Sequence, residues 1–286
     1  MSNNVQRGQI ALGVGTLILV VALYFAGNTG AKNKKENNTD AHAHTESISM
    51  EQYEQQQTEK LAAGEKAQIT ILKDSIAATT ATDTATLKKL YLHLSEIWKT
   101  LHQPAVSAFY YYQYAQKEGE KKVLENAGDN FVEAYKSGTD SIISNNLITF
   151  ALRSYEEGVQ KDTGDINLQI KLADAYVQGS SEPMKGIGML RELEQKHPDN
   201  ISILIALGRL SIQSGQLDKA KERFKKVLQK EPQNTEALYF MAITEAQLGH
   251  TEEAIRLFEL CKAIINHPDF NKEIDEIVKS LKNKKV

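Results

Sequence analysis

The stretch "LGRLSIQSGQLDKAKERF", from Leu207 to Phe224, decides the fold because its small and aromatic residues recur 34 positions later. Gly215 corresponds to Gly249, and Ala220 corresponds to Ala254. Two helices cross closely only where small side chains meet, and a glycine permits the positive φ that the turn between them often needs. The interval therefore predicts two helical hairpins of the same design, one stacked on the other.

Within each hairpin the crossing point should be set by a small residue. We expect Gly208 of one first helix to face Ala220 of its second helix, with Phe224 filling the space beside them. Pro232 should end that second helix, because proline lacks an amide hydrogen and clashes with the preceding turn. The first unit contains Leu204, Leu207, Gly208, Gly215, Ala220, Phe224, Val227 and Pro232, and the next contains Leu238, Met241, Ala242, Gly249, Ala254, Phe258 and Cys261.

This pattern resembles the tetratricopeptide repeat, which runs W-x2-L-G-x2-Y, then A-x3-F, then P. Leucine stands where the repeat prefers Trp, and Ser211 and Glu245 stand where it prefers Tyr, which should loosen that layer of packing. Weaker copies precede the strong pair. The resemblance implies an all-α, right-handed solenoid of helical hairpins over residues 87–266, strongest in 201–234 and 235–266, which binds proteins rather than catalysing a reaction.

Other segments flank the repeats. The C-terminus places Phe270, Ile274, Ile277, Val278 and Leu281 on one helix face, as expected of the helix that caps a solenoid. We predict an N-terminal tail at 1–9, a transmembrane anchor at 10–26, a flexible linker at 28–49, a proximal helix and turn at 50–86, the repeats at 87–266 and the capping helix at 267–286.

The anchor is the segment from Ile10 to Ala26, which contains no charged residue. As a helix it would extend about 26 Å, slightly less than the ~30 Å hydrocarbon core of a bilayer. A cleaved signal peptide is the alternative, although the run is long for one and no convincing small-x-small cleavage site comes after it. Lys32, Lys34 and Lys35 come after the segment and favour a cytoplasmic body. We nevertheless expect an exported body at a bacterial inner membrane, because a short N-terminal apolar segment directs export of the chain behind it; the cytoplasmic alternative stays open.

Composition argues against several other classes. The net charge of −3 gives no basic surface that would follow nucleic-acid phosphates. The scattered histidines accompany no nucleophile at a recognisable spacing, so we expect no enzyme and no cofactor. His42 and His44 lie in the polar linker without a third ligand, so we expect no metal site.

The resemblance places the partner-binding groove on the first helices of the repeats. Arg209 is the only basic residue among the candidates, which disfavours the carboxylate-clamp members of the family. The apolar positions favour a hydrophobic helix or extended peptide, but they could equally pack against the chain's own residues 48–77. The candidate groove residues are Ile170, Asp174, Val177, Ile205, Arg209, Ile212, Tyr239, Ile243 and Gln247.

The sequence supports two functions. The first is a membrane-tethered module that holds a protein or peptide partner near the bilayer, similar to bacterial anchored tetratricopeptide proteins that assist translocation or envelope-protein quality control. The second is a self-associating membrane scaffold, possible as a homodimer through Ala11 and Gly15 in the anchor. The mass of the body in solution separates them, since a stable dimer that buries the groove would favour the scaffold.

Overall fold

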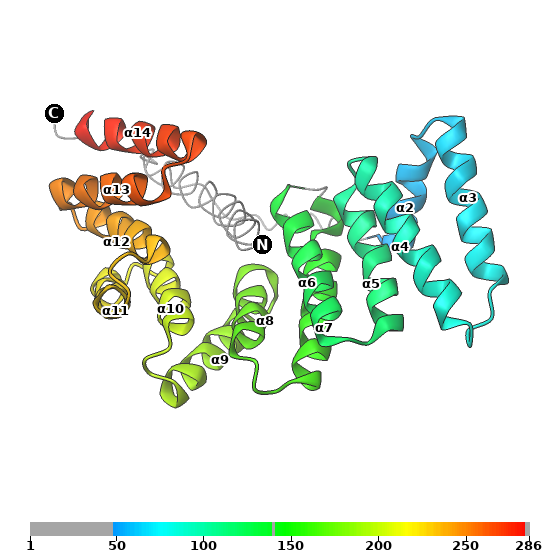
Figure 1. The fold of residues 1–286 in the computed structure, drawn as a ribbon, viewed down its shortest axis with the longest axis horizontal. Helices are drawn as coiled ribbons and strands as arrows, with labels where there is room; N and C mark the ends of the chain where they lie inside the picture. The colour runs from blue at the N-terminus through cyan, green and yellow to red at the C-terminus, as the bar shows by residue number, and fades with distance from the viewer. Residues whose placement is uncertain (1–47, 139–140, 284–286) are drawn as a thin grey trace, which may run out of the picture. The chain divides into compact units, whose positions relative to one another are not determined.

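The computed structural model describes residues 48–138 and 141–283, and its regular elements in these ranges are all helices (Figure 1). The predicted anchor lies outside the described residues. Within them, no helix is both long and apolar enough to cross a membrane. The chain divides into two compact units between Ala206 and Leu207, inside helix α10 (Ile201–Gln213), and each unit is described by itself.

The N-terminal unit comprises the described residues 48–206. Three helical hairpins, α4–α5, α6–α7 and α8–α9, follow one another in it, and the second helix of one hairpin packs against the first helix of the next. Its helices are α2 (Met50–Glu59), α3 (Ala63–Ala78), α4 (Thr84–Thr100), α5 (Pro104–Glu118), α6 (Lys121–Lys136), the short 3-10 helix η1 (Ser141–Ile143), α7 (Ser144–Lys161), α8 (Ile166–Gly179) and α9 (Pro183–Lys196).

The C-terminal unit comprises the described residues 207–283. It contains the end of α10, then α11 (Leu217–Lys230), α12 (Thr235–Gln247), α13 (Thr251–Ile265) and α14 (Pro268–Asn283). Helices α12 and α13 form a hairpin, α11 packs against α12, and α14 packs against α13 (Figure 1). The predicted all-α class and the repeated hairpin are therefore confirmed.

Gly208 marks a close approach of helices, but its neighbour differs from the prediction. A Cβ atom built on Gly208 would lie 2.5 Å from Cζ and 2.6 Å from Cε1 of Phe224. The three atoms nearest to this Cβ all belong to the Phe224 ring, whereas the sequence predicted Ala220 at this contact. The N-terminal unit contains a similar contact between a glycine and an aromatic ring, since a Cβ on Gly128 of α6 would lie 2.4 Å from the ring of Tyr155 on α7.

The turns between helices agree with the sequence. Gly215 has φ of 70° and Gly249 has φ of 83°, the left-handed region that side chains disfavour. Helix α11 ends at Lys230, two residues before Pro232. The predicted glycine turns and the proline stop are thus confirmed.

The C-terminal capping helix also agrees with the prediction from the sequence. Every residue of the predicted apolar face of α14 is buried, from Phe270 to Leu281. Cys261 on α13 is fully buried, and this burial raises the pKa of its thiol to about 12. The thiol therefore stays protonated at neutral pH, as expected of a packed core residue.

The proximal region contains two helices, whereas the sequence predicted one helix followed by a turn within residues 50–86. Helix α2 ends at Glu59, and Ala62 adopts an extended backbone before α3 begins. The carboxylate of Glu65 accepts a hydrogen bond from the Ala62 amide at 3.0 Å, which satisfies a donor at the start of α3. The break lets α2 turn onto the repeats, where it packs against α5.

Polar residues occupy the layer where the repeat prefers Tyr, and they are paired. The Ser211 hydroxyl accepts a hydrogen bond from Arg223 Nη1 at 2.8 Å. The buried carboxylate of Glu245 lies 2.8 Å from Lys221 Nζ and 2.6 Å from His250 Nδ1. Burial opposes ionisation of Glu245, but the hydrogen bonds from these two bases outweigh it and lower its pKa. Ion pairing therefore replaces the missing aromatic packing.

We predict that Glu245→Gln destabilises the C-terminal unit at neutral pH and not in acid. The pKa of Glu245 is lower in the folded state than in the unfolded state, where it is about 4.3. The ionised carboxylate therefore adds to the free energy of unfolding at pH values above the unfolded-state pKa, and this stabilisation is lost as the pH falls through the folded-state pKa. We expect a cost of about 1–3 kcal/mol at pH 7, the range for buried hydrogen bonds to charged groups. Urea unfolding at pH 7 and at successively lower pH measures this.

The exposed Glu222 provides the matched control, because Glu222→Gln makes the same change on the surface of α11. Its unfolding free energy should stay within about 0.5 kcal/mol of the parent at every pH. An equal loss for Glu245→Gln at pH 3 and at pH 7 would show that the ion pair is not the cause.

Candidate partner-binding surfaces

The groove residues expected in the C-terminal unit divide into buried and accessible sets. Tyr239 and Ile243 on α12 are buried, with only 1% and 6% of their surfaces exposed. Arg209 and Ile212 are half-buried, and Gln247 is exposed. The accessible part of this predicted surface is therefore more polar than the sequence suggested.

Tyr239 is surrounded by protein. Its ring lies edge-on to Phe240 and to Phe258, with 5.6 Å between centroids in each pair. Burial, aided by the charge of Glu273 on α14, raises the pKa of its hydroxyl. No described residue forms a hydrogen bond with that hydroxyl. Tyr239 thus contributes to the core of the unit. Its predicted contact with a bound partner stays a prediction.

Arg209 is engaged rather than free. Its Nη1 lies 3.8 Å from a carboxylate oxygen of Glu236, and its guanidinium lies 6.0 Å from the centroid of the Phe240 ring. About a quarter of its side chain is exposed, at 26%. At this predicted groove position, the guanidinium of Arg209 is therefore accompanied by the carboxylate of Glu236 from α12.

The groove residues of the N-terminal unit follow a similar division. Ile170 and Ile205 are buried, with exposures of 8% and 6%, and Asp174 is half-buried. Val177 lies at the crossing of α8 and α9, because a Cβ on Gly186 would come within 2.9 Å of its Cγ2. The binding role of the nine predicted groove residues stays a prediction.

A paired acid–base network joins the first helices α6 and α8. Lys171 Nζ lies 2.7 Å from carboxylate oxygens of both Glu125 and Asp129, and the Tyr155 hydroxyl donates to Asp129 at 2.8 Å. Burial opposes the charge of Lys171, but these bonds outweigh it and raise its pKa. The only sequence signal is the spacing of Glu125 and Asp129, which places both acids on one face of a helix.

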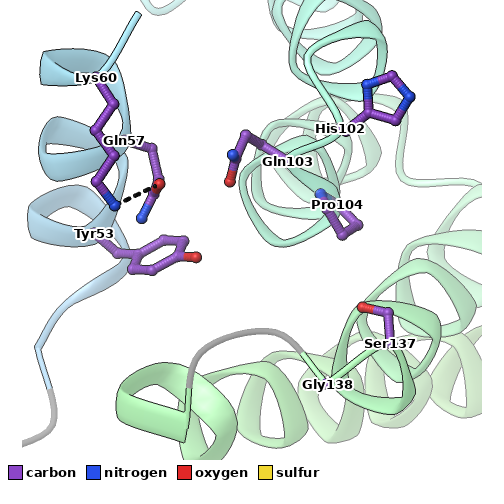
Figure 2. A pocket seen from close by; sticks show the side chains of 8 residues that line it. All are labelled: Tyr53, Gln57, Lys60, His102, Gln103, Pro104, Ser137 and Gly138. Atoms are coloured by element: carbon purple, nitrogen blue, oxygen red, sulfur yellow. Dashed lines mark hydrogen bonds between the residues drawn. The ribbon is translucent and has the colours of Figure 1, made fainter.

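An open pocket of about 420 Å³ lies beside α2 and was not predicted. Three segments line it: helix α2, the turn between α4 and α5, and the end of α6 (Figure 2). Because these segments are far apart in the sequence, no spacing in the chain could have indicated the pocket. The lining residues are Tyr53, Gln57, Lys60, His102, Gln103, Pro104, Ser137 and Gly138.

The side chains of this pocket differ in direction. Figure 2 shows Gln57 and Gln103 extending toward one another from opposite sides, with the Tyr53 hydroxyl between α2 and the opposite wall. The ring of His102 points away from the enclosed space. Among the described residues, no group of three or more His, Cys, Asp or Glu side chains is arranged to hold a metal ion.

Comparison with solved structures finds similar helical proteins at low identity. TTC0263, a tetratricopeptide protein of Thermus thermophilus, shares 15% identity with a TM-score of 0.48, over 66% of this chain and 97% of that chain. MamA residues 41 to the end from Desulfovibrio magneticus shares 13% identity with a TM-score of 0.43, over 64% and 97%. YrrB, described as a tetratricopeptide protein with an unusual peptide-binding site, shares 14% identity with a TM-score of 0.39, over 65% and 91%.

The sequence comparisons bear on the family more directly. A search of curated proteins finds no match. Residues 211–264, which extend from the end of α10 to the end of α13, match the family model described as tetratricopeptide repeat. These are the helices whose glycine turns, aromatic residues and spacing carry the repeat pattern. The resemblance to the tetratricopeptide repeat that the sequence predicted is therefore confirmed for residues 211–264.

Proposed function

We propose that this protein is a membrane-tethered interaction module, which binds a peptide or helix of a protein partner close to the bilayer. The observation that carries the proposal is the tetratricopeptide match at residues 211–264, within a unit whose last helix, α14, caps the stack. The accessible residues Arg209, Ile212 and Gln247 on the first helices would contribute to the contact. A chaperone-like or assembly role fits such a module.

The tether belongs to the same proposal. The uncharged segment from Ile10 to Ala26 would hold the module at the membrane, and residues 28–49 would let it reach partners nearby. Attachment of this kind raises the effective concentration of partners at the same surface. Extraction of membranes with alkaline carbonate tests the anchor: the parent should stay with the membrane, and a chain lacking residues 1–27 should be released. A topology reporter after Val286 tests whether the body is exported.

Crosslinking in intact membranes, followed by capture of the full chain, tests the binding function. We expect Arg209→Ala combined with Gln247→Ala to lower the yield of specific partners by about tenfold or more, as for residues at the centre of an interface. The matched control replaces Arg256 and Gln229, which are exposed on second helices, with alanine.

The control variant should capture the same partners as the parent. If both double variants lose them equally, or if neither does, the first helices are not the working surface. A body that forms a stable dimer and captures no other protein would favour the self-associating scaffold instead.

A further inference from the structure

We infer that the exposed face of helix α11 docks onto an anionic lipid bilayer, with its lysine ammonium groups against lipid phosphates and Leu260 of α13 in the headgroup region. This lipid contact goes beyond the proposed binding of a protein partner. It does not require the proposed anchor at Ile10–Ala26, which would only hold a bilayer within reach, so either can fail alone.

Helix α11 concentrates positive charge that the rest of the C-terminal unit lacks. Its 14 residues include six basic and two acidic residues, a net charge of +4. The other residues of the unit, 207–216 and 231–283, include six basic and ten acidic residues, a net charge of −4. The net charge of −3 for the whole chain therefore conceals one strongly basic helix.

The exposed lysines of α11 lie away from its core contacts. Lys219, Lys226 and Lys230 are exposed, and their spacing of seven and four residues places them on one stripe of the helix. Lys225 is also exposed and extends the basic surface around the helix. Because the side chain of Phe224 is fully buried, the rotation of α11 about its axis is fixed and these lysines stay on the solvent side.

The charges of the exposed lysines are not neutralised by neighbouring acids. Neither Lys225 nor Lys226 forms an ion pair with any residue in the ranges 48–138 and 141–283. The ammonium of Lys219 donates a hydrogen bond at 2.7 Å to a side-chain amide oxygen, which carries no charge. Lys221 differs, because its Nζ lies 2.8 Å from the buried carboxylate of Glu245. The exposed lysines therefore keep a positive charge that an anionic surface can contact.

An exposed apolar residue occupies the equivalent position on the next second helix. Leu260 of α13 lies 34 residues after Lys226, and 38% of its surface is exposed. Phe224 and Phe258 are related by the same interval and are both buried, so α11 and α13 turn corresponding faces toward the core. Both helices pack against α12. Leu260 therefore lies on the same outer side of the unit as the lysines of α11.

A bilayer matches this combination better than other anionic partners do. Binding to a membrane interface gains from attraction to anionic headgroups and from burial of apolar side chains at the headgroup boundary. Clusters of about four or more Lys or Arg residues on an amphipathic helix are typical of binding to anionic lipids. A nucleic acid would need a longer basic track than one helix of about 21 Å, and it would leave Leu260 in water.

The reactivity of individual lysines in the full chain tests this contact. The chain is assembled into lipid nanodiscs of phosphatidylcholine, either alone or with an equal amount of phosphatidylglycerol. A chain that does not enter the discs is added to preformed ones, so the result does not depend on the anchor. A neutral acetylating ester then modifies exposed lysines, and mass spectrometry measures the rate at each position.

We expect Lys219, Lys225 and Lys226 to react about fivefold or more slowly in the anionic discs, since each cation near such a surface is worth about this factor in binding. Lys272 and Lys279, which are exposed on α14, should change by less than about twofold. Because salt screens exposed charges, about 0.5 M sodium chloride should restore the rates on α11.

Charge variants locate the docking face. Lys225→Gln combined with Lys226→Gln should remove the protection of Lys219, because the loss of two cations weakens docking by about tenfold or more. The matched variant, Lys272→Gln combined with Lys279→Gln, makes the same charge change on α14 and should leave Lys219 protected. All four replaced lysines are exposed, so circular dichroism melts should match the parent.

A further pair of variants tests the apolar part of the contact. Leu260→Ser should reduce the protection of Lys219 by about twofold or more, since an apolar group is no longer buried in the headgroup region. Met184→Ser is the matched control, because Met184 on α9 is 68% exposed and lies in the other unit. It should leave the protection unchanged.

Four results would overturn the inference. Equal lysine rates in the two kinds of disc would mean that α11 does not contact anionic lipid. Equal loss of Lys219 protection in the two lysine variants would mean general charge attraction. Equal effects of Leu260→Ser and Met184→Ser would mean that Leu260 does not enter the headgroup region. Protection of the same lysines by a short DNA duplex, but not by anionic discs, would assign the surface to nucleic acid.

Discussion

Gly208→Leu should unfold the C-terminal unit at a temperature at least ~10 °C below that of the parent, a loss of about 3 kcal/mol or more. The reason is the 2.5 Å approach of a Cβ at this position to Cζ of Phe224, a distance that real Cβ contacts do not show. The Phe224 ring is fully buried in a close-packed interior, so it cannot move aside into solvent. Thermal and urea unfolding of residues 48–286 measures the loss.

Gly188→Leu is the matched control for this prediction. A Cβ at Gly188, on α9, would meet no atom within 4 Å. Because leucine favours helix more than glycine does, this variant should keep or gain stability, by up to about 1 kcal/mol. Equal melting of the two variants would show that the contact between Gly208 and Phe224 does not hold the unit together.

Removal of residues 268–286, which deletes α14, should lower the free energy of unfolding of the C-terminal unit at least as much as Gly208→Leu does. The five apolar side chains that α14 buries would be lost, and each is worth about 1.5–3 kcal/mol when fully buried, so we expect a loss of about 5 kcal/mol or more. The surface of α13 beneath them would be exposed, which favours aggregation. Hydrogen exchange of the α12 and α13 amides should become much faster than in the parent.

A chain that lacks only residues 284–286 serves as the control for this deletion, because it keeps all of α14. It should exchange and melt like the parent. Unchanged protection of α12 and α13 after loss of the whole helix would mean that α14 does not stabilise the repeats.

The sequence predicted well those features that depend on spacing within one repeat. The positive φ of Gly215 and Gly249 and the buried face of α14 follow from local backbone demands and from a 3.6-residue period. Side-chain partners were predicted less well. Gly208 faces Phe224 rather than Ala220, because the rotation of one helix about its axis depends on packing in three dimensions.

Features built from distant segments could not be predicted. The pocket combines Gln57, Gln103 and Ser137, which share no motif or interval. The break between α2 and α3 has no proline to mark it and depends on the Glu65 hydrogen bond and on contacts that α2 makes with α5.

The groove could be predicted only in part from the sequence. Repeat register assigned the first-helix residues, but exposure depends on what covers each one. Ile243 is buried although its register position matched the groove, whereas Gln247 on the same helix is exposed. Register therefore selects a helix face, and the surrounding structure decides which residues on that face can contact a partner.

The burial of Cys261 has a practical consequence for spectroscopy. It is the only cysteine in the whole sequence, and its thiol is buried and protonated at neutral pH, so maleimide reagents should leave the folded parent unlabelled. A single cysteine introduced at an exposed position such as Gln247 would then carry the only spin label or fluorophore, without prior removal of a native thiol. Pairs of such labels, one in each unit, would report the distance between the units in solution and its change when a partner binds.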